Sequence, residues 1–255
     1  MMRKICSRRL VLGAWSVLLS AAALAQTLDE VLAKNYEARG GLARITAVSS
    51  ARITGTMSMG GGMEAPFVWQ WKRPNKLRVE FTVQGMTGVQ AYDGQTGWMI
   101  MPFMGSSDPE KMPEDQLADL REQADFEGEL VNWRAKGHQV ELVGKEKVEG
   151  TDAFKLKVVK SNGDVAFVYL DAEYFLEIKG EGKRTLRGQE LEFESSIGDY
   201  KEVGGLMIPH SMSSRAKGAS AGQTITFTKV ELDVPLDDSL FTMPTAAKKN
   251  APATP

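Results

Sequence analysis

Residues 50–104 alternate apolar with polar side chains at a period of two, and this pattern constrains the fold more than any other feature. Turn sequences rich in glycine, proline and asparagine interrupt it at 60–62 and 73–75. Alternation over short segments between tight turns predicts antiparallel strands with one buried face. The apolar members of these segments are Ile53, Met57, Met59, Phe67, Trp69, Trp71, Leu77, Val79 and Phe81.

Helical signals precede this region. Thr27 and Glu30 form a capping box, and the apolar positions that follow share one face of a helix ending at Gly40-Gly41. A short second turn carries Leu42 and Ile45. Further strands are expected at 139–148, 153–160, 164–171, 174–182, 188–199, 206–214 and 222–232.

Residues 106–137 lack strand alternation and predict a helical insertion. Leu117 and Leu120 lie on one helical face after Pro113, and Leu130 with Trp133 marks a second helix. We therefore expect an α+β protein with a large curved sheet of about eleven strands, in one domain over 26–245. The tail 246–255 is expected to be disordered.

The N-terminus reads as a secretory signal peptide over 1–25. A basic start precedes an apolar run, and Ala23-Leu24-Ala25 is a small-x-small cleavage site. Arg8-Arg9 fits either the general secretory route or the twin-arginine route. The only cysteine, Cys6, lies inside this segment, so the remaining chain offers no disulfide and no acylated cysteine. These features predict a soluble periplasmic protein.

Charge and motif content narrow the function classes. Four of the 31 Lys and Arg residues and none of the 33 Asp and Glu residues lie in the signal, so the remaining chain has a formal net charge of −6. A chain of this charge is not expected to bind nucleic acid. The two histidines, His138 and His210, are separated in sequence, and no GxSxG, HExxH, EF-hand or phosphate-loop motif occurs. We therefore expect no enzyme activity, no metal centre and no cofactor.

The segment WMIMPFM at 98–104 departs from alternation because it is apolar on both faces. Eight of the 13 methionines fall between Met57 and Met112. Core packing is one interpretation, since methionine fills irregular gaps. A cavity that accepts varied apolar ligands is another. A third is a Cu(I) site, because Met57, Met59, Met99 and Met101 place thioether pairs on strand faces.

Several phrases along the chain resemble the outer-membrane lipoprotein-sorting family, the LolA/LolB-like proteins. The phrases are YEARGGLARI at 36–45, YDGQTGW at 92–98, VELVGKEKVEGTDAFKLKV at 140–158, YLDAEYFLEIK at 169–179 and YKEVGGLMIPHSM at 200–212. The resemblance implies an incomplete antiparallel β-barrel of about eleven strands wrapped over helices that act as a lid. It also implies a non-catalytic hydrophobic cavity for acyl chains. The family's lid-holding arginine is not transferred, because Arg52 falls on the polar face of its strand.

The expected function is a monomeric periplasmic carrier that takes acylated lipoprotein or lipid cargo from a membrane-bound donor to an acceptor. A lipid-sensing or partner-sensing regulatory module of the same fold is the alternative. The expected lid residues are Leu117, Leu120, Leu130 and Trp133. The expected cavity residues are Met57, Met59, Phe67, Trp69, Trp71, Leu77, Val79, Phe81, Trp98, Met99, Met101 and Phe103.

Overall fold

The computed structural model describes residues 26–59, 62–186 and 189–245. The expected signal peptide, 1–25, and the expected tail, 246–255, lie outside the described residues. Within the described ranges, no helix combines the length and the apolar character needed to cross a membrane.

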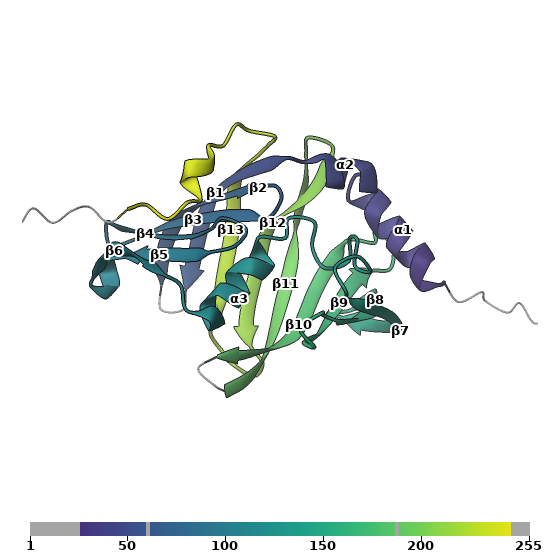
Figure 1. The fold of residues 1–255 in the computed structure, drawn as a ribbon. Helices are drawn as coiled ribbons and strands as arrows, with labels where there is room; N and C mark the ends of the chain where they lie inside the picture. Colours follow the sequence, from purple (N-terminus) through teal and green to yellow (C-terminus); the bar gives the residue numbers. More distant parts are fainter. Residues whose placement is uncertain (1–25, 60–61, 187–188, 246–255) are drawn as a thin grey trace, which may run out of the picture.

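The described chain forms one continuous antiparallel sheet that curves but does not close (Figure 1). It has thirteen strands rather than about eleven, in the order β6-β5-β4-β3-β2-β1-β13-β12-β11-β10-β9-β8-β7. The expected α+β class and incomplete barrel are confirmed. The strands are β1 (Ser50–Met59), β2 (Met63–Lys72), β3 (Lys76–Val83), β4 (Met86–Tyr92), β5 (Gly97–Met101), β6 (Ser106–Lys111), β7 (Gln139–Val148), β8 (Thr151–Val159), β9 (Val165–Asp171), β10 (Glu177–Leu186), β11 (Gln189–Val203), β12 (Leu206–Ala216) and β13 (Gln223–Leu232).

Three α-helices accompany the sheet in the described residues: α1 (Leu28–Ala38), α2 (Leu42–Ala47) and α3 (Glu114–Gln123). The predicted capping box starts α1: the Thr27 side chain accepts from the Glu30 amide, and the Glu30 carboxylate accepts from the Thr27 amide. Figure 1 shows α1 beside the β7–β9 side of the sheet, α2 near the end of β12 and α3 in front of the sheet. Two short 3₁₀ turns, Pro102–Met104 and Asp238–Leu240, complete the elements.

The link between β6 and β7 covers the sheet for a topological reason. These two strands follow each other in sequence but form the opposite edges of the sheet. The chain between them must therefore cross the open face, and α3 lies on this crossing. Both edge strands are rich in charge: β6 reads SSDPEK and β7 reads QVELVGKEKV, with a register shift between Leu142 and Gly144.

The expected helical insertion at 106–137 is therefore only partly right. Residues 106–111 pair with β5 as strand β6, and only 114–123 form an α-helix. The second helix predicted at Leu130 and Trp133 is absent from this described segment, which is built of turns. Glycines at 128 and 137 adopt positive φ there, which breaks helical geometry.

Candidate functional site

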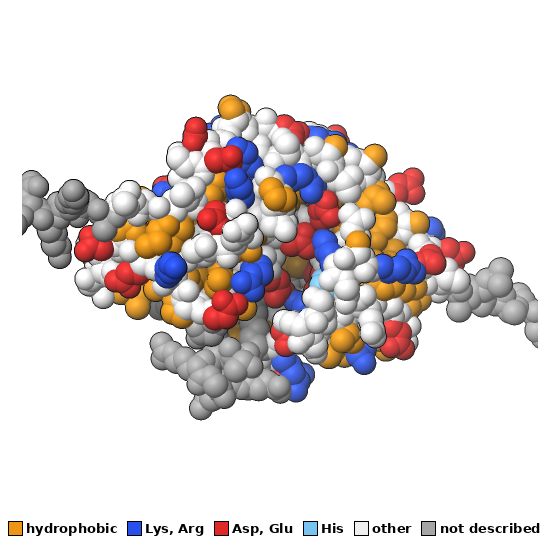
Figure 2. Space-filling model, in the orientation of Figure 1, with side chains coloured by type: hydrophobic (Ala, Val, Ile, Leu, Met, Phe, Trp, Pro, Cys, Tyr) orange, Lys and Arg blue, Asp and Glu red, His pale blue; other side chains and the backbone are white. Residues whose placement is uncertain are grey.

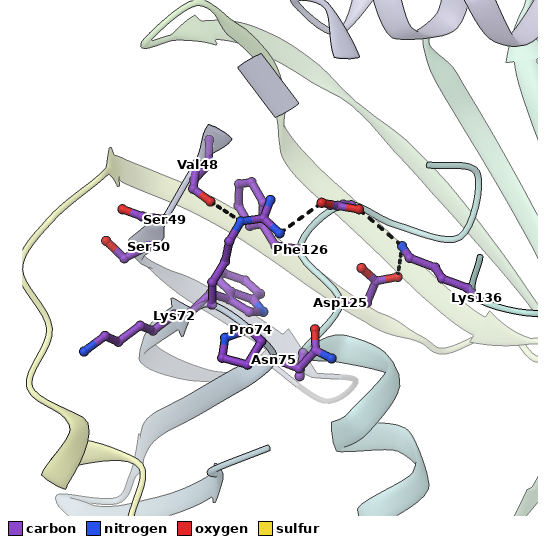
Figure 3. Close-up of a pocket in the computed structure, with 13 residues that line it drawn as sticks. Val48, Ser49, Ser50, Lys72, Pro74, Asn75, Asp125, Phe126 and Lys136 are labelled. Carbon is purple, nitrogen blue, oxygen red and sulfur yellow. Dashed lines mark hydrogen bonds and ion pairs between the residues drawn. The ribbon is translucent and has the colours of Figure 1, made fainter. Parts of the chain in front are cut away.

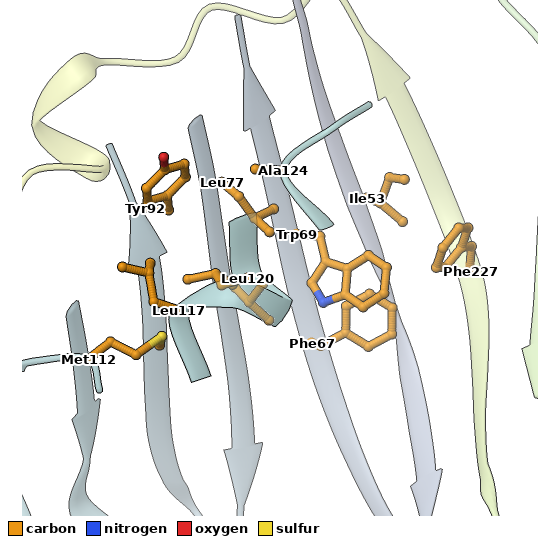
Figure 4. Packing of buried hydrophobic residues seen from close by; sticks show 11 residues of the cluster. Ile53, Phe67, Trp69, Leu77, Tyr92, Met112, Leu117, Leu120, Ala124 and Phe227 are labelled. Atoms are coloured by element: carbon orange, nitrogen blue, oxygen red, sulfur yellow. The ribbon is translucent and has the colours of Figure 1, made fainter. Parts of the chain in front are cut away.

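A cluster of aromatic and aliphatic side chains fills the concave face of the first half of the sheet, and we call it the aromatic cluster (Figure 4). Its buried members from the strands are joined from above by residues of α3 and the chain just before it. The cluster comprises Ile53, Phe67, Trp69, Leu77, Val79, Tyr92, Met112, Leu117, Leu120, Ala124 and Phe227. Trp69 lies between Phe67 at 4.8 Å and Phe227 at 5.6 Å, measured between ring centroids. This part of the barrel is packed rather than hollow.

Glycines in the strands make this packing possible. A Cβ on Gly97 would lie 2.4 Å from the Leu117 side chain, and one on Gly55 would lie 2.7 Å from the Phe67 ring. Contacts this short do not occur, so a larger residue at either position would displace its neighbour. The approach of Leu117 to the strand backbone shows that α3 is docked tightly onto β5.

Most of the predicted cavity residues are brought together here. Met57, Trp71, Phe81 and Met99 are partly buried and pack against the aromatic cluster, and Phe103 packs on Phe81 with ring centroids 5.6 Å apart. Met101 is also buried, at 7% exposure. The side chain of Met59 lies outside the described residues.

Trp98 faces the other way, so its expected place in the cavity is wrong. Its indole packs with Val89 and Ala91 on the convex face, and its Nε1 donates to the Phe241 carbonyl at 2.7 Å. Met99, the next residue, faces the aromatic cluster. The segment WMIMPFM is apolar on both faces because the chain beyond β13 covers the convex side.

The strand order disfavours the Cu(I) interpretation. Met57 lies on β1 and Met99 on β5, with β2, β3 and β4 between them. Neighbouring strands are about 4.8 Å apart, so the two methionine pairs are separated by several strand widths. Four thioethers at such positions cannot share one ion.

A cavity lies beside the aromatic cluster, where the two halves of the sheet meet. Its volume is about 330 Å³. Its walls come from α1, α2, β1, β2, β10–β13, the end of α3 and the segment after it. The apolar lining residues are Ile45, Ile53, Trp69, Trp71, Phe126, Leu130, Ile197, Leu206, Met207, Ile208, Pro209, Met212 and Phe227.

The expected lid residues therefore have different places. Leu117 and Leu120 are part of the aromatic cluster, at 7% and 3% exposure. Leu130 lines the cavity and is 5% exposed. Trp133 packs against a second core cluster, which α1 forms with strands β7–β9. The segment 124–130, of which residues 125–130 line the cavity, covers it.

Ion pairs fasten this covering segment to the rest of the protein (Figure 3). Arg73 donates to the Val48 carbonyl at 2.6 Å and pairs with Glu127 at 2.9 Å. Lys136 pairs with Asp125 at 2.5 Å and Glu127 at 3.8 Å. Figure 2 shows acidic and basic side chains gathered around a hollow in the middle of this face. These polar contacts hold the middle of the cover, while Ala124 and Leu130 anchor its two ends in buried clusters.

Charged and polar groups line one end of the cavity, and we call this end the polar pole. Arg39 from α1, Glu177 from β10 and Tyr200 from β11 meet there. The Tyr200 hydroxyl donates to the Glu177 carbonyl at 2.8 Å. Burial and, to a smaller extent, the nearby Glu129 charge raise the pKa of the Glu177 carboxyl to about 8, while Arg39 opposes both effects. Burial likewise raises the pKa of Tyr200.

Two buried polar atoms among the lining residues have no hydrogen-bond partner in the described part of the chain. They are Asn35 Oδ1 and Trp69 Nε1. Such atoms are rare in folded proteins because each costs free energy when desolvated. The cavity wall therefore contains two polar atoms whose hydrogen-bonding capacity is unused.

The cavity wall includes residues that the sequence pattern did not single out. Ile197, Ile208, Met212 and Phe227 lie on β11–β13, outside the methionine-rich region. Ile197, Met212 and Phe227 lie between small or polar neighbours, as one face of a strand does, whereas Ile208 lies between Met207 and Pro209. Nothing local marks the polar pole, because its residues come from three distant elements.

Solved structures with the same fold exist, although neither protein-family models nor curated protein sequences give a significant match. A LolA superfamily protein from Nitrosomonas europaea has a TM-score of 0.56 at 17% identity, covering 86% of this chain and 98% of that chain. A putative outer membrane lipoprotein-sorting protein domain from Vibrio parahaemolyticus has a TM-score of 0.56 at 12% identity, covering 83% and 94%.

A third structure supports the same grouping. It is a DUF1329 family protein from Desulfovibrio piger, with a TM-score of 0.58 at 13% identity, covering 82% of this chain and 95% of that chain. Identities this low relate folds and leave function to the site. The chain therefore has the LolA-like fold that the phrases in its sequence resemble, an open antiparallel barrel closed over by helices.

Proposed function

We propose that this protein is a carrier that binds acyl chains of lipoproteins or other lipidic cargo in the cavity between the two halves of its sheet. The observation that carries the proposal is the lining of this cavity, which is apolar and aromatic on most sides and about 330 Å³ in volume. This volume lies at the lower end of the range for small-molecule sites. It suits a single acyl chain or part of one.

The energetics favour such a ligand. Burial of acyl methylenes contributes about 0.8 kcal/mol each, so a segment of ten would contribute roughly 8 kcal/mol before the entropic cost of binding. The ion-paired cover over 124–130 provides a route for entry. Separation of Arg73 from Glu127 would release the part of the cover around Phe126, which lines the cavity.

Ile197→Trp in the chain without its signal tests the site. Ile197 lines the cavity but belongs to none of the packed clusters, so a larger side chain there fills space rather than breaking a core. We expect the variant to bind the neutral fluorophore Nile red at least about tenfold more weakly, at an unchanged fold. Val143→Trp is the matched control, since Val143 is 52% exposed and remote from the cavity.

Native mass spectrometry of protein purified without detergent identifies any bound cargo. A co-purifying lipid or acylated peptide that is lost in Ile197→Trp would support the proposal. Equal Nile red affinity in the wild type, the cavity variant and the control would contradict it. Aspartate at Trp69 and Phe81 would be a poorer test, because both side chains belong to or contact the aromatic cluster and the double variant would unfold.

A further inference from the structure

The polar pole contains a guanidinium without a charged partner. Arg39 lies one turn after Asn35 on the same face of α1, and both line the cavity. Its Nη2 donates to the Glu127 carbonyl at 3.0 Å. Among the described residues Arg39 forms no ion pair, so its charge and its remaining donors face the cavity unmatched.

Glu177 lies at the same pole and is also unmatched. Within the described ranges its carboxyl makes no hydrogen bond and no ion pair. Tyr200 of β11 donates to the Glu177 carbonyl, which fixes the start of β10. Asn35 Nδ2 donates to the Phe175 carbonyl at 2.7 Å and ties α1 to the turn just before β10. Glu177 and Arg39 thus line the same cavity.

Each other acidic group of the cavity wall has a basic partner. Asp125 pairs with Lys136, Glu127 pairs with Arg73, and Glu129 pairs with Lys160 at 3.4 Å, a lysine that Glu122 also contacts. Arg39 and Glu177 remain. Because burial and the nearby Glu129 charge raise the pKa of Glu177 to about 8, this carboxyl is mostly protonated at neutral pH. The pole then offers the Arg39 guanidinium, which has no ion-pair partner among the described residues, and an additional O–H donor.

We propose that the polar pole binds the carboxylate of a long-chain fatty acid, with Arg39 as the cationic partner and Glu177 as a hydrogen-bond donor. The hydrocarbon tail then lies along Trp69, Ile197 and Phe227. This inference rests on the proposed function and names the class of cargo for the same cavity. A single negative charge matches the pole, whereas a neutral ester leaves Arg39 unpaired and a doubly charged phosphate monoester exceeds the available charge.

Three ligands with the same twelve-carbon chain test the inference by competition with Nile red. They are dodecanoate, its methyl ester and dodecanesulfonate. Dodecanoate is expected to bind roughly tenfold to hundredfold more tightly than the ester at pH 7, as a charge-assisted hydrogen bond predicts. Both anions are expected to weaken about tenfold between pH 7 and pH 9, because Glu177 ionises in this range and repels them. Dodecanesulfonate stays charged throughout, so a weakening of its binding reflects ionisation of the protein rather than of the ligand.

Three variants separate the roles. Arg39→Met should weaken dodecanoate by roughly tenfold or more and leave the methyl ester within about twofold, whereas Arg39→Lys should retain the preference for the anion. Glu177→Gln cannot ionise but keeps a donor. It should bind dodecanoate as the wild type does at pH 7 and show less than about a twofold change up to pH 9.

The outcomes distinguish this inference from the proposed function. Equal affinity for acid and ester in the wild type, or an unchanged preference in Arg39→Met, would overturn the carboxylate site while leaving the carrier intact. A pH dependence that persists in Glu177→Gln would overturn the role of Glu177. Absence of Nile red binding altogether would contradict the carrier itself.

Discussion

The two halves of the sheet bury their concave faces in different ways. In the first half, β1–β5 and β13 present large aromatics and methionines, and α3 fills the space above them. In the second half, β7–β9 present mainly valine and leucine with Phe154, and α1 packs on them through Val31 and Leu32. Both faces are filled. The open space lies between the halves, so most of the methionine-rich region belongs to a packed core, and of its residues Trp69 and Trp71 also line the cavity.

The largest expected effect lies in the second half. Phe154 is 2% exposed and its ring stacks on Phe175 at 5.6 Å. Phe154→Ala should lower the free energy of unfolding by about 3–5 kcal/mol, since it removes a large buried ring and leaves a cavity. Urea unfolding followed by circular dichroism measures this change. A loss below about 1 kcal/mol would mean that α1 is not packed on β8 as described.

A similar loss in the first half would show that α3 belongs to the core. Leu120, on the buried face of α3, is 3% exposed. Leu120→Ala should cost about 2–4 kcal/mol in the same assay. A near-neutral result, together with faster Nile red entry, would instead make α3 a mobile lid and break the comparison between the two halves.

The region between the halves should respond to pH. Glu177 binds its proton more tightly in the folded chain than in the unfolded chain, because its folded pKa is raised from 4.5 to about 8. Its contribution to stability is therefore present at low pH and declines as pH rises through this window. Glutamine does not ionise, so the free energy of unfolding of Glu177→Gln relative to the wild type should increase by roughly 2–3 kcal/mol as the pH rises from 5 to 8. Parallel pH profiles for both proteins would contradict the raised pKa.

The smallest effect is expected at the outer edge of the second half. Lys147 and Asp152 form an ion pair at 2.9 Å, with each side chain 67% exposed. Lys147→Met should change the free energy of unfolding by less than about 0.5 kcal/mol, since exposed pairs are screened by water and salt. A loss above about 1 kcal/mol would show that the β7–β8 edge is held by charge rather than by its apolar face.

Local patterns predicted most of the strands, the capped helix α1 and the break near α3. Alternation and capping act over a few residues, so they are readable without tertiary information. Strand β6 was missed because SSDPEK carries no apolar alternation, as an exposed edge strand need not. The second helix was predicted wrongly because apolar spacing at Leu130 and Trp133 also suits a chain of turns over a core.

The candidate site was less predictable because it depends on which strands become neighbours. Trp98 and Met99 differ only in which face they present, and the convex face is apolar because a distant segment with Phe241 covers it. The polar pole combines Arg39, Glu177 and Tyr200, which are far apart in sequence. No local motif records such a convergence.

The charged composition of β6 and β7 has a consequence for how an open barrel behaves at high concentration. An unclosed sheet has two edge strands, and their unpaired backbone amides and carbonyls can pair with strands of other molecules and form fibrils. Pro109 removes one donor from β6, Lys145 and Lys147 would crowd against like charges of an added strand, and the register shift near Gly144 twists β7 away from regular pairing. The barrel can thus keep its cavity accessible between two edges that resist self-association.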